Sequence, residues 1–156
     1  MTGIDISRKM LKRAEVRADD GMADVSLALM DAEHLGFPDA AFDAAVATFV
    51  FCSVPDPVRG LKEMNRVLKP GARALFLEHV RVNVPVVGEL MDLVDPLVMR
   101  LMGPHINRRT GQNVEKGGFE IERVRELTAG GLVKLIVGRS KLRKESDRGT
   151  PGGRSR

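Results

Sequence analysis

Short apolar runs alternate with amphipathic segments along the first half of the chain. The runs predict strands at residues 3–6, 25–30, 44–51 and 72–80. Between them, apolar residues recur at helical spacing after Ser7 and after Asp56-Pro57, and both are typical helix starts. Strands that alternate with helices predict an α/β fold with a mostly parallel sheet and helices on both faces.

The stretch from Leu27 to Val50 is the centre of this pattern. Its second apolar run, Ala44 to Phe51, contains no alternating polar residues, which is typical of a strand covered on both faces. A buried helix has the same composition, but the β-branched and aromatic residues in the run favour a strand. We therefore expect a buried parallel strand here.

The second half of the chain is less regular. Residues 86–102 are apolar with helical spacing, interrupted by Pro96, and fit a lid helix, a membrane-surface helix or plain core. Acidic residues on the polar face of this segment favour core or lid, because anionic lipid would repel them. Pro70-Gly71 predicts a turn, and the runs 119–127 and 132–137 predict an antiparallel hairpin at one sheet edge.

Length and composition limit the classes of protein. The 156 residues suit one domain with a core, here residues 1–138, and the single cysteine, Cys52, excludes an internal disulfide framework. The sequence has neither an apolar signal core nor a run of 18 apolar residues, so we expect a cytoplasmic protein. The three histidines lie far apart in sequence, and no metal-ligand cluster of Cys and His is present.

The net charge of +4 is concentrated in a tail. Residues 139–156 contain seven basic and two acidic residues, a net +5, which leaves about −1 for the body of the protein. We expect this tail to be disordered and solvated, although it is also suited to contact with RNA or an anionic membrane. The body has no Trp or Tyr and no basic groove with interleaved aromatics, which argues against a nucleic-acid substrate.

Polar residues follow three of the predicted strands, where ligands bind in open α/β sheets. Asp5 ends the first strand, Asp31 follows the second and Thr48 lies near the end of the third. A carboxylate at such a position can accept hydrogen bonds from the two hydroxyls of a ribose. Each acid taken alone is more often a helix cap or turn residue.

The spacing of these residues is more specific than any one of them. The blocks GIDIS-x-x-ML, D-A-E-x-L-x-F-P-D-x-x-F-D and R-V-L-K-P-G-A-x-x-L-F-L-E-H, between Gly3 and about Val80, resemble the class I S-adenosylmethionine-dependent methyltransferases. The later E-H-V and H-x-N-R-x-T pieces are similar to a subgroup that methylates small molecules and lipids, of the phospholipid N-methyltransferase type.

The resemblance implies roles for particular residues. Asp5 would bind the ribose hydroxyls of S-adenosylmethionine, Ile6 and Met10 would pack on the adenine, and Asp31 and Ala32 would bind its ring edge. Thr48, with Phe49, would line the methionine end. His79 is the first choice for a catalytic base, with a histidine satisfied at a strand end as the equal alternative, and His105, Asn107, Arg108 and Thr110 would shape the acceptor pocket.

One element of the family is absent from this sequence. The family begins with a strand, a glycine-rich loop and a helix, and no Gly-x-Gly motif occurs in the chain. We therefore expect an N-terminally truncated methyltransferase whose unpaired sheet strands close up or pair with another chain, including by self-association.

Three functions remain open at this point. The first is methyl transfer to a small-molecule or lipid-like acceptor, impaired in this form of the chain and carried out with peripheral membrane contact. The second is a non-catalytic binding module with a degenerate methyltransferase fold. The third, an NAD-dependent oxidoreductase, would need the same missing loop and does not explain the D-A-E-x-L and L-K-P-G blocks.

Overall fold

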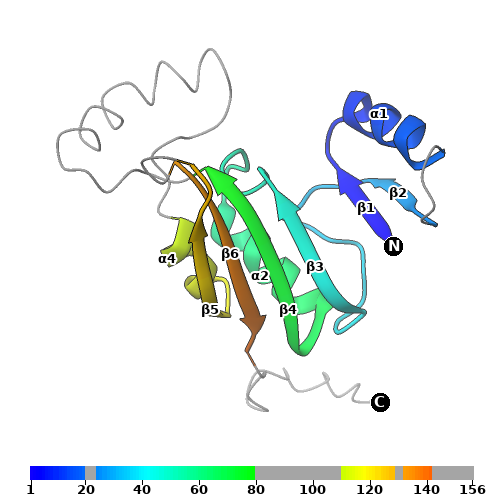
Figure 1. The fold of residues 1–156 in the computed structure, drawn as a ribbon. Helices are drawn as coiled ribbons and strands as arrows, with labels where there is room; N and C mark the ends of the chain where they lie inside the picture. The colour runs from blue at the N-terminus through cyan, green and yellow to red at the C-terminus, as the bar shows by residue number, and fades with distance from the viewer. Residues whose placement is uncertain (20–23, 80–109, 129–131, 142–156) are drawn as a thin grey trace, which may run out of the picture.

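The computed structural model describes residues 1–19, 24–79, 110–128 and 132–141, and in these ranges it contains two separate sheets (Figure 1). The smaller sheet pairs β1 (Thr2–Asp5) with β2 (Ser26–Leu29). The larger sheet has the order β3-β4-β6-β5, formed by β3 (Phe42–Thr48), β4 (Leu68–His79), β5 (Phe119–Glu126) and β6 (Val133–Ser140). Three helices are described, α1 (Arg8–Asp19), α2 (Pro57–Val67) and α4 (Thr110–Lys116).

The smaller sheet is a parallel pair joined through α1. Thr2 lies opposite Ser26 and Asp5 opposite Leu29. Helix α1 begins as predicted, because the Ser7 Oγ accepts the backbone N–H of Met10 at 3.4 Å. No side chain of α1 is fully buried, so this unit has little core of its own.

The larger sheet is mixed, and its parallel and antiparallel parts follow the prediction. β3 and β4 are parallel, and β5 and β6 form the expected antiparallel hairpin. β6 is the strand that pairs with β4, which leaves β5 at the outer edge. Helix α2 begins at Pro57 with Asp56 as its N-cap, whose carboxylate accepts the N–H of Arg59 at 3.0 Å.

The hydrophobic core lies between the larger sheet and the helices α2 and α4. Phe76 of β4 and Phe119 of β5 are fully buried and meet edge to face, with ring centroids 5.2 Å apart. Leu61 from α2 and Val114 from α4 are also fully buried and complete this layer. The core therefore belongs to the larger sheet, and it positions the carboxyl ends of β3 and β4.

Two predictions about the central strands were wrong. The run from Ala44 to Phe51 is not a strand covered on both faces, because β3 ends at Thr48 and the backbone turns at Phe49, whose φ is 54°. The side chain of Val46 is 71% exposed whereas that of Ala47 is buried, so the described residues cover only one face of β3. The strand type was predicted correctly, but its burial was not.

Pro70 and Gly71 do not form a separate turn before a strand. They lie inside β4, where the pairing with β3 shifts. From Phe42 to Ala44 the chain of β3 advances by two residues, while the paired chain of β4 advances by five. Gly71 has a φ of 78°, which a residue without a Cβ adopts at little cost. The segment is thus an irregularity that bends β4, rather than its start.

The boundary of the C-terminal tail also differs from the expectation. β6 continues to Ser140, so Arg139 is part of the sheet, and its guanidinium donates to the carbonyl of Gly71 at 2.8 Å. Residues 142–156 lie outside the described residues, as do the predicted helical segment 86–102 and the loop residues His105, Asn107 and Arg108. Within the described ranges, no helix combines the length and apolar character needed to cross a membrane.

Candidate functional site

The predicted site residues lie at the carboxyl ends of the parallel strands. Asp5 is the last residue of β1, Asp31 follows β2 by two residues, and Thr48 is the last residue of β3. β1 and β3 run in the same direction, so these ends lie at the same end of both sheets (Figure 1). This is the edge at which open α/β sheets bind ligands.

Asp5 sits beside two exposed apolar side chains. One oxygen of its carboxylate, Oδ1, accepts the backbone N–H of Ser7 at 2.7 Å, which fixes the turn between β1 and α1. Ile6 is 73% exposed and Met10 is 47% exposed. A carboxylate next to exposed apolar surface suits a ligand with a hydroxyl-bearing ring and a flat apolar ring.

Asp31 and Ala32 lie on the neighbouring strand end. The Oδ1 of Asp31 accepts the N–H of Glu33 at 2.8 Å, and its Oδ2 lies 3.5 Å from the Nδ1 of His34. The bond from the Glu33 N–H, aided by His34, lowers the pKa of Asp31 against the opposing effect of burial. Asp31 is therefore a hydrogen-bond acceptor at neutral pH.

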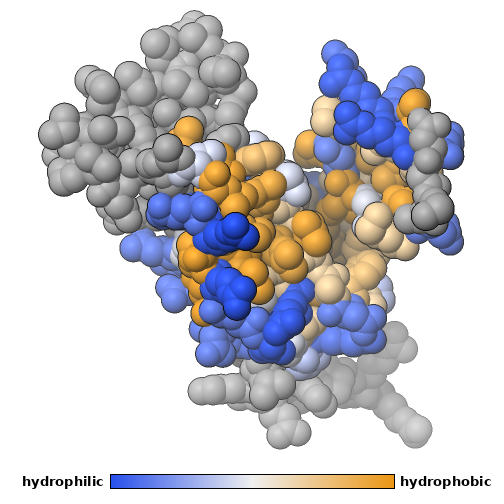
Figure 2. All heavy atoms as spheres, viewed as in Figure 1, coloured by the Kyte–Doolittle hydropathy of each residue, from blue (hydrophilic) through white to orange (hydrophobic). Residues whose placement is uncertain are grey.

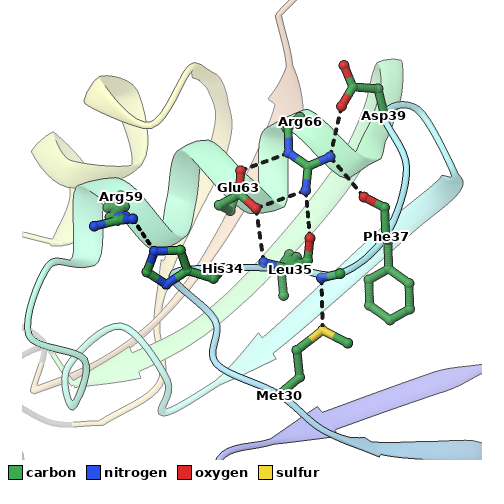
Figure 3. A network of polar contacts seen from close by, with 9 residues as sticks. Met30, His34, Leu35, Phe37, Asp39, Arg59, Glu63 and Arg66 are labelled. Atoms are coloured by element: carbon green, nitrogen blue, oxygen red, sulfur yellow. Dashed lines mark hydrogen bonds and ion pairs between the residues drawn. The ribbon is translucent and has the colours of Figure 1, made fainter.

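A partly buried ion-pair network holds the loop after Asp31 against α2 (Figure 3). The guanidinium of Arg66 donates to the backbone oxygens of Leu35 and Phe37, both at 2.8 Å, and to Asp39 at 2.8 Å. It also pairs with Glu63 at 2.8 Å, which lowers the pKa of that carboxyl, and Glu63 in turn accepts the N–H of Leu35 at 2.9 Å. Of the five hydrogen bonds that Arg66 donates, three reach the loop and two go to Glu63, so one side chain fixes the loop to α2.

An open depression lies beside this network. Its volume is about 470 Å³, and it is lined by Glu33, His34, Leu35, Gly36, Arg59, Lys62 and Glu63. The ring of His34 contacts the guanidinium of Arg59 at its rim (Figure 3). The depression contains none of the predicted site residues, and its lining of mixed charge suits no single ligand class.

Glu78 anchors the loop that follows β3, and the sequence interpretation missed this role. Its side chain is fully buried, and its Oε1 accepts the backbone N–H groups of Val50 and Phe51, each at 3.0 Å. Its Oε2 accepts the N–H of Cys52 at 3.2 Å. Burial raises the pKa of Glu78, and the three N–H donors oppose that rise. The only signal in the sequence was one acidic residue at the end of an apolar run.

The loop held by Glu78 directly follows Thr48 at the carboxyl end of β3. Phe49 donates its N–H to the carbonyl of Leu77 at 2.8 Å and then turns the chain through its positive φ. Cys52 is fully buried, and burial raises the pKa of its thiol. A thiol of this kind is a structural residue rather than a reactive nucleophile.

The remaining predicted residues are placed only in part. His79 is the last residue of β4, opposite Val133, and its side chain lies outside what the structure describes. Thr110 begins α4 and is buried, so it supports the packing of that helix. Helix α4 itself was not predicted, because the sequence TGQNVEK contributes a single large apolar residue, Val114.

The structure brings some of these residues together and separates others. β1 and β2 are paired, and the N–H of Met30 donates to the carbonyl of Asp5 at 3.1 Å, so Asp5 and Asp31 lie at neighbouring strand ends. Thr48 belongs to the other sheet. The assigned roles of these residues are not tested by the fold and stay predictions.

The residues around Asp5 and Asp31 fit the adenosine part of S-adenosylmethionine. Two carboxylates and two exposed apolar side chains match its ribose hydroxyls, its amino group and its flat ring. The methionine part has only Thr48 and the following loop in the described ranges. A metal site is a poorer fit, because those ranges contain no cluster of three His, Cys, Asp or Glu side chains that could hold an ion.

Comparison with known proteins shows which proteins this chain is similar to. Residues 1–76 match the family model described as a methyltransferase domain. The chain is 34% identical over 103 residues to the ubiquinone/menaquinone biosynthesis C-methyltransferase UbiE of Bdellovibrio bacteriovorus, covering 66% of this chain and 44% of that protein. It is 40% identical over 101 residues to the demethylmenaquinone methyltransferase of Staphylococcus carnosus, covering 65% and 42%. The match thus spans less than half the length of these relatives.

A solved structure shows the same fold. The SAM-dependent methyltransferase of Methanosarcina mazei superimposes with a TM-score of 0.70 at 25% identity, covering 91% of this chain and 82% of that one. S-adenosylmethionine is accordingly the methyl donor that these similarities imply. The chain has the Rossmann-like methyltransferase fold, and its sequence is similar to those of S-adenosylmethionine-dependent methyltransferases.

Proposed function

We propose that this chain takes part in methyl transfer from S-adenosylmethionine to a small, lipid-like acceptor of the quinone type. The observation that carries the proposal is the placement of Asp5 and Asp31 at paired strand ends, beside the exposed side chains of Ile6 and Met10. The acceptor class is suggested by the relatives, which are named as methyltransferases of ubiquinone and menaquinone biosynthesis. The phospholipid-type acceptor expected from the later motifs stays a prediction.

In this proposal the chain binds and orients the donor and the acceptor, while the donor supplies an electrophilic methyl group on its sulfonium. Asp5 accepts the ribose hydroxyls, Asp31 and the backbone of Ala32 bind the adenine edge, and Thr48 borders the methionine end. Because methyl transfer is an in-line displacement, alignment accounts for much of the rate. His79 is the candidate for removing a proton from an acceptor that must be deprotonated.

We further propose that the chain alone transfers methyl groups poorly. Asp5 and Thr48 belong to two sheets that no described strand joins, so the two ends of the cofactor site are not fixed relative to each other. The sequence also lacks a Gly-x-Gly loop through which backbone could approach the methionine part. A chain that binds its donor but turns over slowly fits both observations. A lipid-like acceptor would bring the chain to a membrane surface, where the basic residues after Arg139 favour anionic lipid.

A non-catalytic binding module is the second candidate, and the division of the site between two sheets favours it. Isothermal titration with S-adenosylhomocysteine, followed by transfer of a labelled methyl group to a reduced naphthoquinone, separates the two. Micromolar binding that is lost in Asp5→Asn and kept in Asp19→Asn, together with transfer, supports the enzyme. Binding without transfer supports the module, and a folded chain that does not bind overturns both.

A further inference from the structure

The loop from Asp31 to Leu35 lies against one polar stripe of α2. The helix contacts the loop at three points spaced three and four residues apart, so these points lie on one face of the helix. They are the guanidinium of Arg59 and the carboxylate of Glu63, both drawn in Figure 3, and the backbone N–H of Asp56. The face of the larger sheet turned toward the viewer in Figure 2 carries mainly apolar side chains, whereas α2, which packs on the opposite face, offers the loop this polar stripe.

Gly60 of α2 allows the backbone of the loop to approach the helix. A Cβ at this position would lie 3.4 Å from the carbonyl oxygen of Ala32, which is van der Waals contact. It would also lie 3.1 Å from the ring of Phe51, which is closer than most contacts of a Cβ. The helix therefore holds the backbone at Ala32 as well as the side chains of the loop.

The contact with Arg59 decides which nitrogen of the His34 ring carries a hydrogen. A guanidinium only donates hydrogen bonds, so the Nε2 of His34 that faces Arg59 acts as the acceptor and carries no hydrogen. In a neutral imidazole the hydrogen is then on Nδ1, the nitrogen that lies 3.5 Å from the Oδ2 of Asp31. Arg59, His34 and Asp31 therefore form a chain in which each donor points toward the carboxylate.

Asp31 ends this chain with both of its oxygens held. Its Oδ1 accepts the N–H of Glu33 at 2.8 Å, and its Oδ2 faces the Nδ1 of His34. These two contacts restrict rotation of the carboxylate, while 43% of the side chain stays exposed. Because a carboxylate oxygen has two lone pairs, Oδ2 can accept from His34 and from the amino group of a ligand at the same time.

From this geometry we infer that His34 is a positioning residue, which orients the carboxylate of Asp31 toward the amino group of an adenine, and that Arg59 holds its ring in the required tautomer. The inference rests on the function proposed above, because it takes Asp31 as the residue that meets the adenine. A His34 that only stabilised the loop would favour no particular group of the ligand. A positioning His34 makes the affinity depend on the adenine amino group.

Nitrogen NMR of the histidine rings tests the tautomer without any ligand, with the His34 signals assigned from their loss in His34→Asn. At about pH 8, where an ordinary imidazole is neutral, His34 should show a protonated Nδ1 and an unprotonated Nε2. Arg59→Met should shift the ring toward a mixture of the two tautomers. The matched control is Lys62→Met, which removes a charge from the same helix and the same depression and should leave the tautomer unchanged. A native ring with its hydrogen on Nε2 would overturn the inference.

Isothermal titration tests the dependence on the amino group. The probes are S-adenosylhomocysteine and its analogue with hydrogen in place of the adenine amino group. His34→Leu should weaken binding of the first about tenfold, as expected for one oriented hydrogen bond to a charged group, and should leave binding of the second within about twofold. His34→Asn, whose amide nitrogen takes the place of Nδ1, should stay within about threefold of the native affinity for both probes.

The outcomes separate this inference from the proposed function. A native chain that binds no S-adenosylhomocysteine overturns both. Native binding with unchanged affinity in His34→Leu, or with an equal loss for the two probes, overturns the inference alone. If His34→Leu does not fold, Arg59→Met provides the same comparison: a loss confined to S-adenosylhomocysteine supports the inference, and an equal loss for both probes overturns it.

Discussion

Replacing Glu78 tests whether a buried carboxylate builds the loop beside Thr48. The two informative variants are Glu78→Ala and Glu78→Gln, because neither carries the charge of the native side chain. Their difference therefore excludes the free energy of burying a charge. It reports the hydrogen bonds that one oxygen makes to the loop, together with the packing that the buried side chain provides and alanine removes.

The expected difference follows from the bonds in the structure. In Glu78→Gln the remaining oxygen still accepts from Val50 and Phe51, and in Glu78→Ala neither N–H has an acceptor. The Phe51 bond is buried and leaving its donor unpaired costs about 1–3 kcal/mol, while the partly buried Val50 bond contributes about 0.5–1.5 kcal/mol. The alanine variant should therefore be less stable than the glutamine variant by about 2–4 kcal/mol.

Urea denaturation of both variants under identical conditions gives this difference. The matched control is the pair Glu120→Ala and Glu120→Gln on the same sheet, where the side chain is exposed and the two variants should agree within about 0.5 kcal/mol. Hydrogen exchange adds a local measurement, because the amide of Phe51 should exchange faster in Glu78→Ala than in Glu78→Gln. Equal stability of the two Glu78 variants, with equal exchange at Phe51, would refute the anchoring role.

Three further predictions concern stability. Burial raises the pKa of Glu78 above its ordinary 4.5, so the folded state holds this proton more tightly than the unfolded state does. The free energy of unfolding should therefore fall as the pH rises from 4.5 through the raised pKa. A pH series of urea denaturations should lose this component in Glu78→Gln, and an unchanged slope would contradict it. Arg66→Lys cannot reproduce the forked bonds to the loop and should lower stability by about 1–2 kcal/mol in thermal denaturation; unaltered melting would show that the loop is held otherwise. Gly117→Ala places a Cβ 2.4 Å from the Cβ of Leu61 and should destabilise the protein by about 1–3 kcal/mol. Gly111→Ala in α4 brings its Cβ no closer than 4.0 Å to another atom and should stabilise the protein by about 0.5–1 kcal/mol. Equal effects of the two substitutions would disprove the close contact at Gly117.

The order of strands and helices could be predicted from the sequence because local signals coincide with the fold. The cap at Ser7, the Asp56-Pro57 start of α2 and the hairpin of β5 and β6 all depend on neighbouring residues. The position of Asp5 and Asp31 at strand ends follows from the same local pattern.

Features that depend on distant partners could not be predicted in this way. The apolar run at Val46 indicates a buried strand, but the exposure of its side chains is decided by whether another element covers each face of β3. The bonds from Glu78 reach residues 26 to 28 positions earlier in the chain, and no periodicity encodes that contact. Helix α4 was missed for a related reason, since burial of Val114 against the core, rather than its own composition, stabilises it.

The lack of a core under β1, α1 and β2 has a consequence for cooperativity. An isolated pair of strands is marginally stable in water, and α1 contributes no fully buried side chain. This unit should therefore open at lower free energy than the larger sheet, as a separate cooperative segment. It also carries Asp5 and Asp31, so a ligand bound there would have to order the segment as it binds. Its measured affinity would then be lower than the contacts alone suggest, by the free energy of that ordering.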